Sequence, residues 1–141
     1  MAEEQNLITI DNQRYLLDDL NEEAKKQLVN IQTTEAFIQR LNNQRAITQM
    51  ARQGYAEKLS GLLPEQEAAA NKKKDVITID EKRYNLDDFS EEANQQIVNL
   101  RTADQEQQEL GNQLAIAQTA RQAYGRALAE AIKDATPVKP Q

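Results

Sequence analysis

The sequence contains the same pattern twice. Residues 8–63 align with residues 77–132 without a gap at an offset of 69, and 28 of the 56 aligned positions are identical. A tandem duplication this regular makes the repeat the structural unit, and it favours a pseudo-two-fold molecule. The repeat therefore constrains the architecture, but it assigns no biochemical activity.

Composition argues against several functional classes. The 141 residues include no cysteine, which excludes disulfides and thiolate catalysis, and no histidine, the commonest general base and metal ligand. A net charge of −6 argues against sequence-independent binding to nucleic acid. No apolar run has the length of a membrane span, and the N-terminus lacks a signal-peptide pattern. We therefore expect no cofactor, no metal, no catalytic residue and no membrane partner, and we expect a cytosolic protein or a particle assembled in the cytosol.

Each repeat opens with the pattern of a β-hairpin, over residues 7–17 and 76–86. A two-residue turn at 12–13 would pair Ile10 with Tyr15 and place the large apolar side chains on one face. Because a lone hairpin is marginal in water, this face must pack on the helices. The residues expected on it are Ile8, Ile10, Tyr15, Leu17, Ile77, Ile79, Tyr84 and Leu86.

A long helix follows each hairpin. Asn21 and Ser90 are favourable N-cap residues, and no proline interrupts residues 21–63 or 90–133. Apolar residues recur every three or four positions, which is typical of a thin, alanine-rich, coiled-coil-like seam. The seam expected in the first helix consists of Ala24, Leu28, Ile31, Ile38, Leu41, Ile47, Ala51, Tyr55, Leu59 and Leu62.

The linker decides how the helices can pair. A helix over residues 21–63 would be about 64 Å long, whereas the linker 64–75 spans at most about 41 Å. If the helices are unbroken, the chain cannot return to the start of the first helix, so a parallel pair is excluded and the helices run antiparallel. The expected fold is mostly α with small β: two β-hairpin–long-helix repeats, 1–63 and 76–134, with paired antiparallel helices and a flexible tail at 135–141.

The middle of each helix leaves two alternatives open. Asn42-Asn43 and Gly111-Asn112 fall at matching positions, where a break would turn each long helix into a helical hairpin. The surrounding polar stretches, 39–44 and 105–113, are either an exposed recognition surface or a hydrated part of the seam that sets its register.

The two ends of the repeat resemble a known family. The opening reads ITIDxxRYxLDDLxxEA, the close reads QLxxAQTARxAYxxAL, and the clearest match is QTARQAY at residues 118–124. These patterns are similar to a family of small uncharacterised proteins of tailed phages, especially phages of marine bacteria and cyanobacteria, and of some marine bacterial genomes. Asn12 and Glu81 stand where the family has a turn glycine. The resemblance implies a phage-related protein and carries over no activity.

Two arginine–tyrosine pairs are the candidate binding residues. Arg52 precedes Tyr55, and Arg121 precedes Tyr124, by three positions, so each pair shares a helix face. Both residue types are frequent interface anchors, which favours a binding patch repeated at both ends of the molecule. In the alternative, structural interpretation, each arginine pairs with an acid of the opposite hairpin, Asp87 or Asp88 for Arg52, while the tyrosine packs beneath it.

Acidic residues cluster at the start of each helix, in Asp18-Asp19 with Glu22-Glu23 and in Asp87-Asp88 with Glu91-Glu92. Such clusters can hold cations or take part in acid–base chemistry. The simpler interpretation is favourable charge at a helix N-terminus, because no glycine-containing calcium loop and no nucleophile accompany them.

The sequence therefore predicts a non-enzymatic protein–protein interaction or assembly protein, phage-related and of the virion or its assembly. The alternative is a small host-directed binding protein that modulates a host enzyme or transcription factor. The expected partner is a protein, either a second copy in a homo-oligomer, a virion protein or a host protein, and the expected location is the host cytoplasm or the virion.

Overall fold

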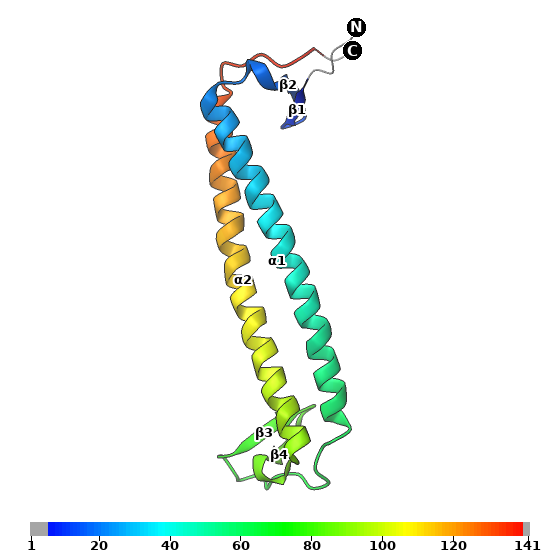
Figure 1. Cartoon of the computed structure of the whole chain (residues 1–141). Coiled ribbons are helices and arrows are strands. Elements are labelled where there is room, and N and C mark those ends of the chain that lie inside the picture. The colour runs from blue at the N-terminus through cyan, green and yellow to red at the C-terminus, as the bar shows by residue number, and fades with distance from the viewer. Residues whose placement is uncertain (1–5, 140–141) are drawn as a thin grey trace. The chain divides into compact units, whose positions relative to one another are not determined.

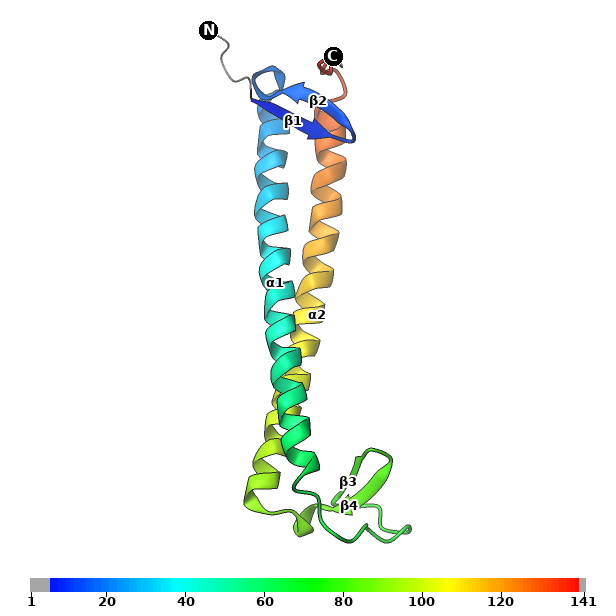
Figure 2. The same cartoon turned by 90° about the vertical axis from the view of Figure 1, so that its right-hand side faces the viewer.

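The computed structural model describes residues 6–139 and contains two long helices and two β-hairpins (Figures 1 and 2). The mostly helical, two-hairpin fold predicted from the sequence is confirmed. Both helices are continuous through their middles, so a break into helical hairpins does not occur. The elements are β1 (Leu7–Ile10), β2 (Gln13–Leu16), η1 (Leu17–Asp19), α1 (Glu22–Ser60), β3 (Val76–Ile79), β4 (Lys82–Asn85), η2 (Leu86–Asp88) and α2 (Glu91–Ala131).

The chain forms two compact units that differ from the two sequence repeats. Unit 1 comprises Met1–Asn42 and Asn112–Gln141, and unit 2 comprises Asn43–Gly111. Each unit therefore combines the hairpin and first half of the helix of one repeat with the second half of the other helix. Within unit 1 the helix segments run antiparallel, because Asn21 bonds to Ala131 and Glu35 pairs with Arg121.

The core of unit 1 lies where β1–β2 meets the start of α1 and the end of α2 (Figure 2). The alternation of the strands turns Ile8 and Ile10 toward the helices, where both are half-buried. The buried members of this core are Tyr15, Leu20, Ala24, Leu28, Leu128 and Ile132.

Unit 2 is built in the same way around β3–β4, the start of α2 and the end of α1. Tyr84 and Phe89 meet edge to face, with ring centroids 6.0 Å apart. The buried members of this core are Leu59, Tyr84, Phe89, Ala93 and Ile97.

Both hairpin turns lie one residue earlier than the sequence analysis placed them. Ile10 pairs with Gln13, and the turn residues Asp11 and Asn12 have φ values of 50° and 66°. A tight turn of this kind needs positive φ at both positions, which aspartate and asparagine tolerate and glutamine does not favour. The predicted pairing of Ile10 with Tyr15 is therefore wrong. The apolar face is unchanged, because the shift preserves the alternation of the strands.

The seam prediction fails at Ile47, whose side chain is 70% exposed. A helix returns to the same face after about seven residues. Thr48, seven residues after the fully buried Leu41, is therefore the half-buried position. Ile116, the aligned residue in α2, is 71% exposed for the same reason.

The C-terminal tail lies beside β2. Ala135 packs against the core of unit 1, and the Val138 N–H donates to the Arg14 carbonyl at 2.6 Å. The flexibility of the tail stays a prediction for residues 135–139, and its last two positions, 140–141, lie outside the described residues. The tail occupies the outer edge of β2, which would otherwise be open for pairing.

The linker does the same for β4 in unit 2. The Ala68 N–H donates to the Arg83 carbonyl at 2.7 Å. The Arg83 guanidinium also donates to the carbonyl of Ala70 at 2.9 Å and to that of Lys72. A five-donor guanidinium suits this role, because it can satisfy several carbonyls of a loop that forms no helix or strand.

Candidate functional site

Each unit contains a groove between its hairpin and its helices, with a volume of about 340 Å³. Groove 1 is lined by Ile8–Asp11, Leu28, Ile31, Gln32, Glu35, Arg121, Gly125 and Leu128. Groove 2 is lined by Arg52, Ala56, Leu59, Ser60, Ile77–Asp80, Ile97, Leu100, Arg101 and Asp104.

The two grooves are equivalent position by position. An offset of 69 converts every residue that lines groove 1 into a residue that lines groove 2, and Ser60 is the single addition in groove 2. The strand residues come from β1 or β3 and never from β2 or β4, so both grooves run along the same edge of their hairpins. The repeated sequence thus builds the same surface feature twice.

That hairpin edge is open in both units. The Leu86 N–H donates to the Asp75 carbonyl, so the hydrogen-bonded pairs of the hairpin alternate from there and include Ile77 with Tyr84 and Ile79 with Lys82. The backbone N–H and C=O of Thr78, which lies between Ile77 and Ile79, therefore point outward. Among residues 6–139 these groups have no hydrogen-bond partner. The same register leaves Thr9 outward in unit 1. Each hairpin therefore has one edge covered by the segment that follows the helix of the other repeat, and one edge open beside its groove.

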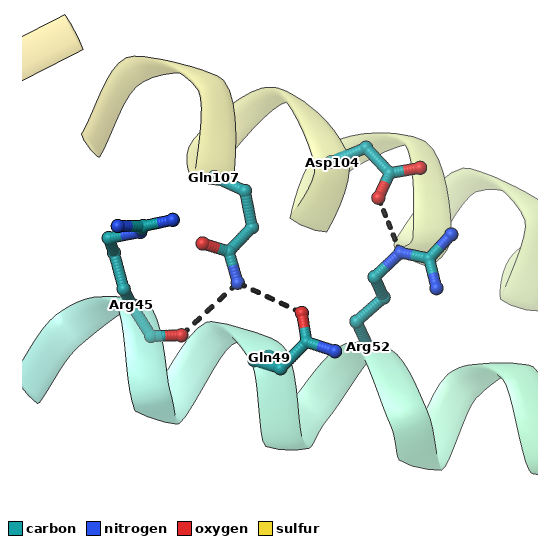
Figure 3. A network of polar contacts seen from close by, with 5 residues as sticks. All are labelled: Arg45, Gln49, Arg52, Asp104 and Gln107. Atoms are coloured by element: carbon teal, nitrogen blue, oxygen red, sulfur yellow. Dashed lines mark hydrogen bonds and ion pairs between the residues drawn. The ribbon is translucent and has the colours of Figure 1, made fainter. Parts of the chain in front are cut away.

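An arginine–carboxylate pair lies in each groove. In unit 2, Arg52 Nε donates to Asp104 Oδ1 at 2.5 Å (Figure 3). In unit 1, Arg121 Nη2 and Nε donate to Glu35 Oε1 at 2.7 and 3.1 Å. All four side chains are roughly half exposed. Exposed ion pairs contribute about 0–1 kcal/mol to stability. These two pairs therefore fix the positions of the arginine and carboxylate side chains more than they stabilise the fold.

The hydrogen bond to Asp104 and the negative charge of that carboxylate raise the pKa of Arg52, while slight burial opposes the shift. The guanidinium is therefore charged at every physiological pH. It presents fixed positive charge and has no proton to exchange in a reaction.

A second polar bridge joins the helices of unit 2 next to this pair. Gln107 Nε2 donates to the Arg45 carbonyl at 3.1 Å and to Gln49 Oε1 at 3.3 Å (Figure 3). The aligned residue in unit 1 is Ile38, which cannot donate. The polar contacts across the helix pair therefore differ between the units, although the ion pair is present in both.

The structure places Arg52 and Arg121 in the grooves, but with partners that the sequence analysis did not identify. The structural alternative paired Arg52 with Asp87 or Asp88, and this is wrong. Leu59 is the residue of α1 that packs on hairpin β3–β4, and Arg52 lies two turns, about 10 Å, before it along the helix. At that level the antiparallel α2 presents Asp104 instead.

Tyr55 and Tyr124 lie outside the grooves. Both side chains are half-buried, at helix positions close to the seam. Neither hydroxyl forms a hydrogen bond within the described range 6–139. The tyrosines thus do not join the arginines in one patch, and their role as binding residues stays a prediction.

The sequence analysis missed Glu35 and Asp104, and with them the grooves. A signal was present, because these positions align at the offset of 69 and both are acidic, while most neighbouring positions differ. The two acids also stand opposite the two repeated arginines when the helices are antiparallel. Reading the repeat and the helix direction together would have identified both ion pairs.

The acidic clusters that begin each helix are solvated. Asp18, Asp19 and Asp87 are exposed, and Asp88 Oδ2 accepts a hydrogen bond from Asn85 at 3.2 Å. Within residues 6–139 no group of three or more aspartate or glutamate side chains has the arrangement of a metal site. In the same range no helix has both the length and the apolar character of a membrane span.

Comparison with known proteins gives one match. The model of a family of unknown function, DUF6447, matches residues 65–139, slightly more than half of the chain. This range contains the linker, hairpin β3–β4, α2 and the tail up to Lys139. No curated protein and no solved structure matches the chain. The chain belongs to this family of unknown function.

Proposed function

We propose that this protein is a non-enzymatic interaction or assembly protein, phage-related, and that its partners are proteins bound at the two grooves. The observation that carries the proposal is the repetition of one groove, with the same open strand edge and the same ion pair, in both units. A chain with two like sites can hold two copies of a partner, or link two partners. When both sites are occupied by one assembly, the avidity exceeds the affinity of either site alone. Such bivalency suits assembly.

The chemistry of the grooves supports binding rather than turnover. Their floors are isoleucine and leucine side chains, and their polar groups are hydroxyls, carboxylates, guanidiniums and the amide of Gln32. The carboxylates of Glu35 and Asp104 are each held by an arginine. The sequence offers neither histidine nor cysteine as a base or nucleophile.

The resemblance of the repeat to phage proteins supports a virion or assembly component. Quantitative mass spectrometry of purified particles tests this directly, and we expect the protein at a fixed copy number per particle. Absence from particles, together with retention of one host protein on the tagged chain, would instead establish the alternative, a host-directed binding protein.

Variants that fill the grooves connect this test to the proposed surface. Ala56→Leu fills groove 2, and Gly125→Leu fills groove 1, where a side chain at Gly125 would meet no atom within 4 Å. Both should lower incorporation into particles. Matched controls are Ala115→Leu and Gly54→Leu, which make the same changes at exposed helix positions outside the grooves and should leave incorporation unchanged.

A further inference from the structure

We infer that groove 2 binds an extended segment of the partner protein, which adds as a strand to β3 and places an acidic side chain on Arg101. This inference rests on the proposed function and names the form of the partner. Its first basis is the open edge of β3, where the outward N–H and C=O of Thr78 lie directly beside the groove. An added strand would satisfy both groups.

The second basis is the floor of the groove. Leu59 and Ile97 are buried, Leu100 is half-buried, and all three line the groove beneath the open edge. Successive side chains of a strand point to opposite sides, so every second residue of an added segment would face this floor. Apolar residues at alternate positions are therefore the sequence that fits.

The third basis is charge. Arg101 lines groove 2 and is exposed, and among the residues that the structure describes it forms no hydrogen bond or ion pair. Arg52, by contrast, is held by Asp104. Arg101 is therefore the guanidinium of groove 2 that can receive a carboxylate from a ligand, in the two-pronged geometry that arginine favours.

Groove 1 provides an internal comparison, because Gln32 replaces Arg101 at the aligned position. The lining of groove 2 has two arginines and two aspartates and is neutral, whereas the lining of groove 1 has Arg121 against two acids and is net negative. An acidic segment therefore prefers groove 2. Arg101→Gln in groove 2 together with Gln32→Arg in groove 1 should make groove 1 the preferred site.

The test uses the full chain, immobilised and panned against a displayed library of random ten-residue peptides. We expect enriched peptides that alternate apolar residues and carry an aspartate or glutamate. The most enriched peptide, made synthetically, should bind Arg101→Gln about tenfold more weakly, because a neutral amide replaces the charged guanidinium that pairs with the carboxylate. Gln32→Arg should raise the stoichiometry from one peptide per chain to two.

Strand addition has its own readout. The Thr78 amide should exchange with deuterium rapidly in the free protein and slowly with peptide bound, and a proline at the centre of the peptide should abolish binding. Ala56→Leu should block the peptide, and Ala115→Leu should not. Enriched peptides without acidic residues, or equal binding to Arg101→Gln, would overturn the inference.

The failure of this inference is distinguishable from failure of the proposed function. If no groove-dependent peptide emerges while particles still contain the protein at fixed copy number, the assembly role stands and strand addition is wrong. If the protein is absent from particles and retains no protein partner, the proposed function itself is wrong.

Discussion

The side chain of Asn21 joins the beginning of α1 to the end of α2. Its Oδ1 accepts from the Ala24 N–H at 2.8 Å, and its Nδ2 donates to the Ala131 carbonyl at 2.9 Å. One amide thus satisfies an unpaired N–H of one helix and an unpaired C=O of the other. Ser90, the aligned residue of the second repeat, caps only its own helix, through the Ala93 N–H at 3.1 Å.

This double cap predicts an ordered series of stabilities. Asn21→Ser keeps the N-cap and loses the bond to Ala131, so the free energy of unfolding should fall by about 1 kcal/mol. Asn21→Ala loses both and should cost about 2 kcal/mol. Ser90→Ala, which removes a cap alone, should cost about 1 kcal/mol. Urea denaturation followed by circular dichroism measures all three, and an unchanged Asn21→Ser variant would show that the link to Ala131 contributes nothing.

The hairpin turns predict a gain in stability. Glu81 has a φ of 69°, a left-handed conformation that disfavours a residue with a Cβ. Glu81→Gly should therefore stabilise the protein by about 1 kcal/mol. Asn12→Gly should gain less, because asparagine tolerates its φ of 66°.

Thermal melting distinguishes these two effects from a general effect of glycine. Lys82→Gly places glycine in the adjacent strand position, where φ is negative, and it should lower the melting temperature. A melting temperature that also falls for Glu81→Gly would show that the left-handed turn carries no strain.

The fold could be read from the sequence where side-chain periodicity determines it. The hairpin faces follow from alternation, which a shifted turn preserves, so Tyr15 and Tyr84 are buried as predicted. The turn position itself depends on which residues accept positive φ, and there the usual glycine signal was missing. The prediction that Ile47 lies in the seam failed because steps of three and four residues drift around the helix. The spacing must be counted from a residue known to be buried, such as Leu41.

The grooves and the covered edges were beyond the reach of pattern analysis. Each groove combines a strand and a half-helix of one repeat with a half-helix of the other, so no local window contains it. The hydrogen bond between Val138 and Arg14 joins two backbone groups. Because it involves no side chain, no residue type in the sequence indicates it. Only the antiparallel pairing of the helices brings such segments together.

The buried leucines near the middles of the helices predict large losses on truncation. Leu41 and Leu110 are 1% and 2% exposed and occupy aligned positions. Leu41→Ala and Leu110→Ala should each lower the free energy of unfolding by about 2–5 kcal/mol, through lost burial and a residual cavity. Ile47→Ala, at a 70% exposed position of α1, is the control and should change stability by less than about 1 kcal/mol. Similar losses for Leu41→Ala and Ile47→Ala in urea denaturation would contradict the observed seam.

The tail bonds to the outer edge of β2 through the Val138 N–H, so we expect this backbone donor to contribute to stability. Val138→Pro removes the N–H that bonds to the Arg14 carbonyl, and it should lower the free energy of unfolding by about 1 kcal/mol. Val138→Ala keeps that N–H, so the difference between the two variants isolates the hydrogen bond from the loss of side-chain packing. Ala68→Pro makes the corresponding change beside β4, and it should have a similar effect, because the Ala68 N–H bonds to the Arg83 carbonyl.

Hydrogen exchange at the Val138 amide checks the same contact without a substitution. The amide should exchange more slowly than that of an unstructured chain, because an edge strand is its acceptor. Equal stabilities of Val138→Pro and Val138→Ala, together with unprotected exchange at Val138, would mean that the tail does not cover β2 in solution. The open edge would then include β2 as well as β1, and unit 1 would offer a partner strand two edges instead of one.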